Sequence, residues 1–193
     1  MTVMTMLDRR TRDGLLARAA TPRDPATRAL AGVIASGREG CIPALEEGLG
    51  GRRFAALVGR YFPGADPGQA PPGSALFPAV EYGDLMRLFL DHRSANRRDA
   101  ELVAHAMAIG SLGANHLWED MHLDSRAELS ALIRAYFGPL AALNVRDMKW
   151  KNFFYKQLCE REGLRACRAP RCEQCCDQAR CFGPEDGPGA GRP

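Results

Sequence analysis

Apolar residues recur along much of the chain at the three- and four-residue intervals of amphipathic helices. Two stripes show this spacing, one formed by Phe54, Leu57, Val58, Tyr61 and Phe62 and the other by Leu129, Leu132, Ile133, Tyr136 and Phe137. Each stripe would cover one face of a helix. Both segments are therefore predicted to be helices that pack against a core.

Local start and stop signals support a helical chain. Ser125-x-x-Glu128 has the form of a capping box before the second stripe, and the Gly-Pro pair at 138–139 follows that stripe as a stop signal. An earlier helix is predicted to begin at Asp24 and to end at Gly37. Further helices are predicted around residues 6–20, 81–93, 97–110 and 145–161.

The composition favours the same fold class. Val, Ile and Thr, which favour strands, are scarce, whereas Ala and Leu recur throughout the 193 residues. A chain of this length is expected to form one domain. We predict a mainly α protein with a single helical domain (1–162, including a Pro/Gly-rich loop at 63–78), a C-terminal cysteine-rich metal-binding loop (163–182) and a disordered tail (183–193).

Charge and hydropathy restrict the cellular setting. The formal net charge is only +3, and both signs are spread along the chain, unlike the clustered basic face of a nucleic-acid-binding protein. Asp8 comes too early for the apolar run of a signal peptide, and no apolar stretch reaches the length of a membrane span. We therefore expect a cytoplasmic protein that binds neither nucleic acid nor a membrane.

The cysteines are concentrated near the end of the chain. Of the seven, Cys41 stands alone and the other six fall within residues 159–181. The signature C-x4-C-x2-C-x5-C is formed by Cys167, Cys172, Cys175 and Cys181. In a reducing cytosol, clustered cysteines bind metals or serve redox chemistry more often than they form disulfides. Metal ligation would also supply the folding energy that this segment, poor in apolar residues, lacks.

The cysteine spacing is compatible with two kinds of metal centre. Zinc is satisfied by four thiolates and commonly uses C-x2-C, but usually as two well-separated pairs. A continuous run of closely spaced cysteines is more typical of an iron–sulfur cluster. The spacing therefore favours an iron–sulfur centre and leaves zinc as the alternative.

Two further segments accompany the signature: HLWEDM at 116–121 and MKWKNFFYKQLC at 148–159. Together with the cysteines they resemble the nitrogen-fixation protein NifQ family, over about residues 80–181. The resemblance implies a molybdenum–iron–sulfur protein that supplies molybdenum for the nitrogenase iron–molybdenum cofactor. It implies that the cluster ligands are Cys167, Cys172, Cys175 and Cys181. Cys159 and Cys176 lie outside the family motif and are secondary thiols on this interpretation.

The resemblance also implies a cargo and partners. The cofactor would be a Mo–Fe–S cluster, molybdate would be the metal source, and the partners would be nitrogenase cofactor-assembly proteins, namely the iron protein and the cofactor scaffold. Thiolates would hold the irons, whereas molybdenum would keep oxygen, nitrogen or exchangeable ligands. Such a protein is a metallocluster carrier and donor, and we expect it not to be an enzyme.

The four histidines are His92, His105, His116 and His122. A single histidine is more often a surface or core residue than a ligand. His116 and His122 flank the segment that resembles the family, so they are the better candidates for an extra ligand or a transfer site. On one continuous helix they would point about 120° apart, and they could share a metal only if the segment breaks at Gly113 or Asp124.

Catalytic motifs give no support to an enzyme. The sequence has no G-x-S-x-G elbow, no H-E-x-x-H helix and no phosphate-binding Gly-rich loop. Residues of the acidic pairs Glu46-Glu47 and Glu119-Asp120 are adjacent and would point in different directions on a helix. Two other classes of protein remain open: a zinc-stabilised helical protein-binding module, and an iron–sulfur redox sensor or electron carrier.

Overall fold

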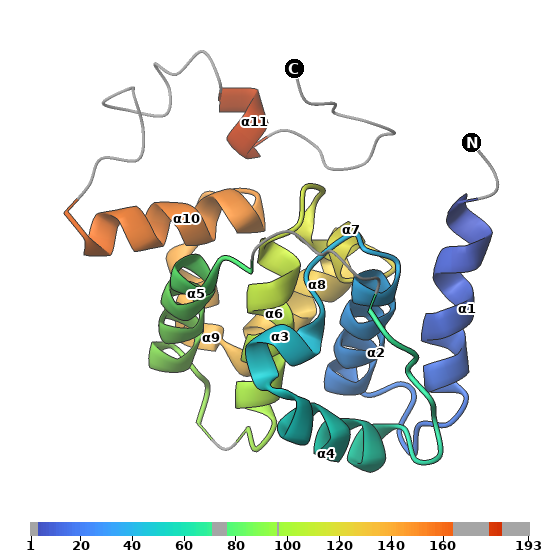
Figure 1. The fold of residues 1–193 in the computed structure, drawn as a ribbon. Helices are drawn as coiled ribbons and strands as arrows, with labels where there is room; N and C mark the ends of the chain where they lie inside the picture. Colours follow the sequence, from blue (N-terminus) through green and yellow to red (C-terminus); the bar gives the residue numbers. More distant parts are fainter. Residues whose placement is uncertain (1–3, 71–76, 96, 164–177, 183–193) are drawn as a thin grey trace.

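A computed structural model describes residues 4–70, 77–95, 97–163 and 178–182 (Figure 1). The regular structure within these ranges is helical, and they contain no strand. The helices form one body, which confirms the prediction of a mainly α, single-domain protein. No helix in the described ranges combines the length and the apolar character needed to cross a membrane.

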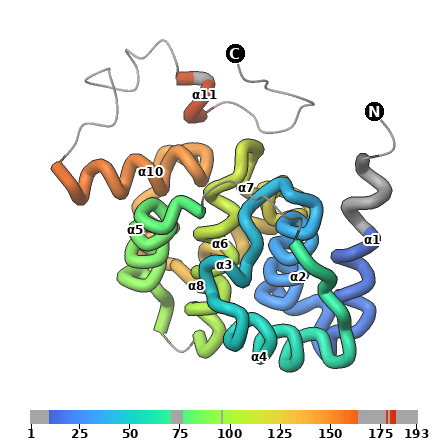
Figure 2. The backbone as a smooth tube through the Cα atoms, viewed as in Figure 1, coloured from blue at the N-terminus to red at the C-terminus, as the bar shows by residue number. Residues whose placement is uncertain are grey.

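The helices of the described residues are numbered in chain order. They are α1 (Met4–Leu16), α2 (Pro25–Arg38), α3 (Leu45–Leu49), α4 (Gly51–Tyr61), α5 (Ala79–Asp91), α6 (Ala100–Ser111), α7 (Leu117–Asp120), α8 (Arg126–Tyr136), α9 (Gly138–Leu143), α10 (Trp150–Arg161) and α11 (Gln178–Phe182). Helices α1 and α10 lie on opposite sides of this body (Figure 2).

Helix α6 is the centre of the core. It packs against α2, α3, α5 and α7, and it is buried around its whole circumference from Val103 to Ser111. A helix that is apolar on every side belongs in an interior. On the side of α5, three aromatic rings meet, from α5, from α10 and from the junction of α8 and α9. The Phe89 ring lies 5.3 Å from the Phe137 ring and 4.9 Å, edge-on, from the Phe154 ring.

The predicted start signal of α2 is confirmed, but its predicted end is wrong. The Asp24 carboxylate accepts a hydrogen bond of 2.9 Å from the Thr27 N–H, and Pro25 occupies the first turn. The helix continues through Gly37 to Arg38, and Glu39 is its C-cap. Gly37 lies against Ala44, whose Cα is 3.2 Å from the position of an added Cβ. This glycine therefore allows the backbone at Ala44 to pack closely against α2, and it does not end the helix.

The capping box of α8 forms in a modified way. The Ser125 hydroxyl accepts from the Glu128 N–H at 3.2 Å, whereas the Glu128 carboxylate accepts from the N–H of Asp124, one residue earlier than expected. Helix α8 ends at Tyr136 as predicted. The Gly-Pro pair at 138–139 also begins α9, which the sequence pattern did not predict.

The predicted Pro/Gly-rich loop at 63–78 is described in part. Its described residues contain no helix or strand before α5 begins at Ala79. The Arg38 guanidinium donates a hydrogen bond of 2.9 Å to the Pro67 carbonyl and ties the loop to α2. Residues 71–76 and the predicted tail at 183–193 lie outside the described residues.

A buried polar pair joins α5 to α6. The Tyr82 hydroxyl forms a hydrogen bond with Nδ1 of His105, which is only 5% exposed. Burial, reinforced by the nearby Arg53 charge, lowers the pKa of His105 to about 4. Burial raises the pKa of Tyr82 to about 12. Both side chains are therefore neutral near pH 7, which suits a site inside the core.

His105 should make the protein sensitive to acid. Its folded-state pKa of about 4 lies below the ordinary histidine pKa of 6.5, so the unfolded state binds more protons between these values. The free energy of unfolding therefore falls as the pH drops from 6.5 to 4, by about 3 kcal/mol in total. His105→Gln should remove most of this fall in urea unfolding at pH 6.5 and 4.5. An undiminished fall in the variant would assign the acid sensitivity elsewhere.

Close backbone packing joins α2 to the turn after α7. A Cβ added to Gly32 would lie 2.0 Å from the backbone oxygen of Met121, which itself is fully buried. Neither backbone can move aside without disturbing the core. Gly32 is therefore required here for space.

Gly32→Ala should lower the free energy of unfolding by about 3 kcal/mol, because the added methyl group overpacks a buried contact. Gly59→Ala is the matched control, since Gly59 is exposed on α4 and an added Cβ there meets nothing within 4 Å. The control should be neutral or gain up to about 1 kcal/mol of stability. Urea unfolding of both variants measures the difference; equal values would contradict the predicted clash.

Candidate metal centre

Of the four predicted cysteine ligands, the structure describes the last one, Cys181. Cys181 lies on α11 and is half-buried against the core. Cys167, Cys172 and Cys175 lie outside the described residues, as does the secondary thiol Cys176. The part of the chain that is described contains no group of three or more His, Cys, Asp or Glu side chains able to hold a metal ion. The described residues therefore include one predicted ligand, the thiol of Cys181, and the helices against which it packs.

Helix α11 is attached to the beginning of α10 by hydrogen bonds (Figure 1). The Lys149 N–H donates to the Cys181 carbonyl at 2.8 Å. The Asn152 side-chain amide donates to the Arg180 carbonyl at 3.0 Å and to the Cys181 sulfur at 3.7 Å. These contacts place the thiol of Cys181 against the first turn of α10.

Side-chain packing adds to this attachment. The Arg146 guanidinium lies 5.0 Å from the centre of the Phe182 ring, within the range of a cation–π contact. Phe182 also packs against the hydrophobic core, as Cys181 does. The segment before α10 therefore holds both residues at the end of α11.

The beginning of α10 is itself fixed by a buried ion pair. The Lys151 ammonium forms a salt bridge with Asp120 on α7, and it donates a second hydrogen bond of 2.9 Å to the Gly113 carbonyl. Asp120 is only 2% exposed. Its other contacts come from Asn115, whose backbone N–H and side-chain amide donate to the carboxylate at 3.0 Å and 2.9 Å.

Burial and charge act on Lys151 in opposite directions. Burial lowers the pKa of Lys151 below its usual value, and the neighbouring Asp120 charge partly offsets this fall. A buried charge of this kind is tolerated only with a partner and further hydrogen bonds. Gly113 is needed at the same place, because an added Cβ would lie 2.3 Å from Oδ2 of Asp120.

The ion pair between Lys151 and Asp120 joins the two segments on which the family resemblance rests. HLWEDM supplies Asp120, and MKWKNFFYKQLC supplies Lys151 together with Asn152, which contacts Cys181. The sequence pattern assigned no role to the polar residues of the second segment. A signal was present, since Lys149, Lys151 and Asn152 interrupt an otherwise aromatic helix start. The aromatic residues Trp150, Phe153 and Phe154 of this segment are buried in the core.

His116 and His122 do not share a continuous helix. His116 is the N-cap of α7, which ends at Asp120, and His122 follows in a left-handed conformation with φ of 48°. The segment therefore breaks, but at Met121, before the predicted site at Asp124. His122 Nε2 lies 3.3 Å from a carboxylate oxygen of Glu39, so this histidine contacts α2.

The two other described cysteines are Cys41 and Cys159. Cys41 is exposed just after α2, and its N–H donates to the Ser36 carbonyl at 3.1 Å. Cys159 is half-buried on α10, seven residues beyond Asn152 and thus about 10 Å further along the helix axis. This arrangement is compatible with their assignment as ordinary or secondary thiols.

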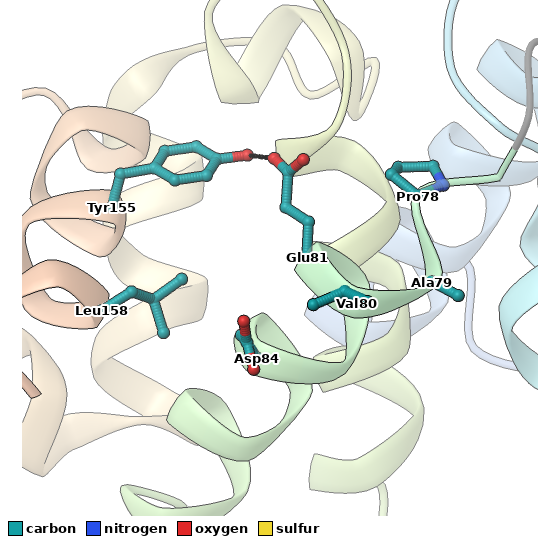
Figure 3. A pocket seen from close by; sticks show the side chains of 7 residues that line it. All are labelled: Pro78, Ala79, Val80, Glu81, Asp84, Tyr155 and Leu158. Carbon is teal, nitrogen blue, oxygen red and sulfur yellow. Dashed lines mark hydrogen bonds between the residues drawn. The ribbon is translucent and has the colours of Figure 1, made fainter. Parts of the chain in front are cut away.

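An open pocket of about 460 Å³ lies between the start of α5 and the face of α10 that carries Tyr155 and Leu158 (Figure 3). Its lining residues are Pro78, Ala79, Val80, Glu81, Asp84, Tyr155 and Leu158. The Tyr155 hydroxyl donates to the Glu81 carboxylate across the pocket, and burial together with this carboxylate raises the pKa of Tyr155. Because none of these seven residues is a cysteine or histidine, the pocket lacks the donor set of the predicted cluster.

The fold and the site define a class: a single-domain helical protein that holds the last cysteine of a C-terminal cysteine signature against its own core. The NifQ family model matches residues 26–183. The chain therefore belongs to the NifQ family, and the predicted resemblance is confirmed.

Curated relatives support this membership. Protein NifQ of Azotobacter vinelandii is 38% identical over 168 residues, which cover 79% of this chain and 86% of the relative. Protein NifQ of Rhodobacter capsulatus is 34% identical over 163 residues, covering 81% and 89%. Protein NifQ of Klebsiella pneumoniae is 42% identical over 87 residues, covering 45% and 52%. No solved structure matches the chain.

Asp120→Ala should lower the free energy of unfolding by about 3–5 kcal/mol, because it leaves the Lys151 charge buried without its partner. Asp91→Ala is the control: Asp91 pairs with Arg161 at 2.6 Å, but both side chains are about half exposed. The control should lose less than about 1 kcal/mol. Urea unfolding at one pH compares the two variants, and losses of similar size would contradict the importance assigned to the buried pair.

Proposed function

We propose that this protein carries a molybdenum–iron–sulfur cluster and donates molybdenum for biosynthesis of the nitrogenase iron–molybdenum cofactor. The observation that carries the proposal is the attachment of Cys181 to α10 in a member of the NifQ family. A cysteine whose carbonyl accepts a backbone N–H and whose sulfur accepts a side-chain amide N–H suits a metal ligand. The cluster is cargo, so the protein acts as a donor and not as an enzyme.

The proposed ligands are Cys167, Cys172, Cys175 and Cys181. Thiolates are the usual protein ligands of iron–sulfur clusters, and four closely spaced ones can bind a single cluster. Molybdate is a hard oxyanion, whereas the cofactor under assembly is rich in sulfur. A carrier that binds iron through thiolates and leaves molybdenum on exchangeable ligands would link these two chemistries.

The partners follow from the proposed role. Molybdate would supply the metal, and the nitrogenase iron protein and the cofactor scaffold would receive the cargo. We place this exchange in the cytoplasm, where a reducing environment keeps the motif cysteines as thiols. The near-neutral net charge of +3 accords with protein partners better than with nucleic acid.

Cys181→Ala should lose most of the iron and molybdenum from full-length protein purified without oxygen, because it removes a cluster ligand. Cys41→Ala is the matched control and should retain both metals, since Cys41 lies outside the motif. Metal analysis and the absorption spectrum measure the outcome. A colourless parent protein with one zinc would favour a structural zinc module, and a brown protein without molybdenum would favour an electron carrier or redox sensor.

A further inference from the structure

We propose that Asn152 is a positioning residue for the cluster: its side-chain amide donates a hydrogen bond to the sulfur of Cys181 and sets that ligand's direction and donor strength. The proposal rests on the proposed function, in which Cys181 is a cluster ligand. Asn152 itself would touch no metal. It acts through the thiolate.

The geometry gives one amide group two acceptors. Nδ2 of Asn152 carries two hydrogens, and its two acceptors belong to neighbouring residues: the Arg180 carbonyl at 3.0 Å and the Cys181 sulfur at 3.7 Å. The longer distance is appropriate for sulfur, which is a larger atom than oxygen. One planar group therefore fixes both the backbone before Cys181 and the side chain of Cys181.

The position of Asn152 is in turn determined by its neighbours. Lys151 is held by the buried ion pair with Asp120, and Phe153 is 3% exposed in the core. Asn152 lies between them on the first turn of α10, so its backbone is fixed, and its two hydrogen bonds set the direction of its side chain. On the cysteine side, the Lys149 N–H holds the Cys181 carbonyl at 2.8 Å. Donor and sulfur are thus both attached to the same rigid element, as a hydrogen bond that orients a metal ligand requires.

The chemistry favours a neutral donor at this place. A hydrogen bond to a ligating sulfur withdraws electron density from it and raises the reduction potential of the cluster. An amide provides this bond at every pH and adds no charge. Aspartate has the same shape, but its carboxylate only accepts hydrogen bonds and would repel a thiolate.

The test compares Asn152→Leu and Asn152→Asp with Gln157→Leu in full-length protein loaded with its cluster. Gln157 is the matched control, because it is an amide on the same helix whose contact is the exposed Glu160. Both Asn152 variants should shift the midpoint potential of the cluster to more negative values, with the larger shift in Asn152→Asp. Metal retention should weaken by about 10- to 100-fold, whereas the control should match the parent protein.

A second measurement uses the metal-free protein and does not depend on the proposed function. Iodoacetamide alkylation, followed by peptide mass spectrometry, should be faster at Cys181 in Asn152→Leu and unchanged at Cys41. Faster alkylation with an unchanged potential would overturn the proposal, because Asn152 would then only attach α11 to the domain. Unchanged alkylation and potential would also overturn it. A parent protein that holds only zinc would refute the proposed function, while zinc retention and alkylation would still test the contact of Asn152.

Discussion

The buried ion pair between Asp120 and Lys151 is the constraint on which the site depends. In the weakly polar interior, either charge alone would be strongly unfavourable, so the two side chains must stay together once the chain has folded. Their pairing fixes the beginning of α10 against α7, although 29 residues separate the two helices along the chain. Asn152 follows Lys151 directly, so a contact made for folding also places the group that holds the Cys181 sulfur.

Helix α10 combines two kinds of packing on different faces. Phe153 and Phe154 enter the core, and Trp150 joins them while its indole N–H donates to the Ser130 hydroxyl at 2.9 Å. Apolar contacts alone are not directional and would permit small rotations of the helix. The hydrogen bonds of Trp150, Lys151 and Tyr155 remove this freedom because each requires a defined direction. The aromatic face thus stabilises the helix, and the polar contacts set its orientation.

The sequence predicted the long helices well because their apolar stripes extend over two turns or more. It missed α3, α7, α9 and α11, which have at most six residues and are too short to show a period. The cysteine motif could be recognised because its meaning lies in local spacing. Asn152 could not, because its role depends on a partner 29 residues later. Glu119 and Asp120 do point in different directions, as predicted: Glu119 accepts from the His116 N–H, whereas Asp120 turns inward to Lys151, a partner that local spacing does not indicate.

The attachment of α11 to the beginning of α10 has an entropic consequence. The chain leaves α10 at Gly163, beyond its last turn, yet Cys181 is bound at the first turn of the same helix. The twelve-residue helix is about 18 Å long, so the chain returns over this length between Gly163 and α11, and the protein's own contacts hold the two ends in place. Most of the loop-closure entropy is then lost on folding, before any metal arrives. A cluster bound as proposed would need to close only the short segments between successive cysteines, which lowers the entropic cost of its capture.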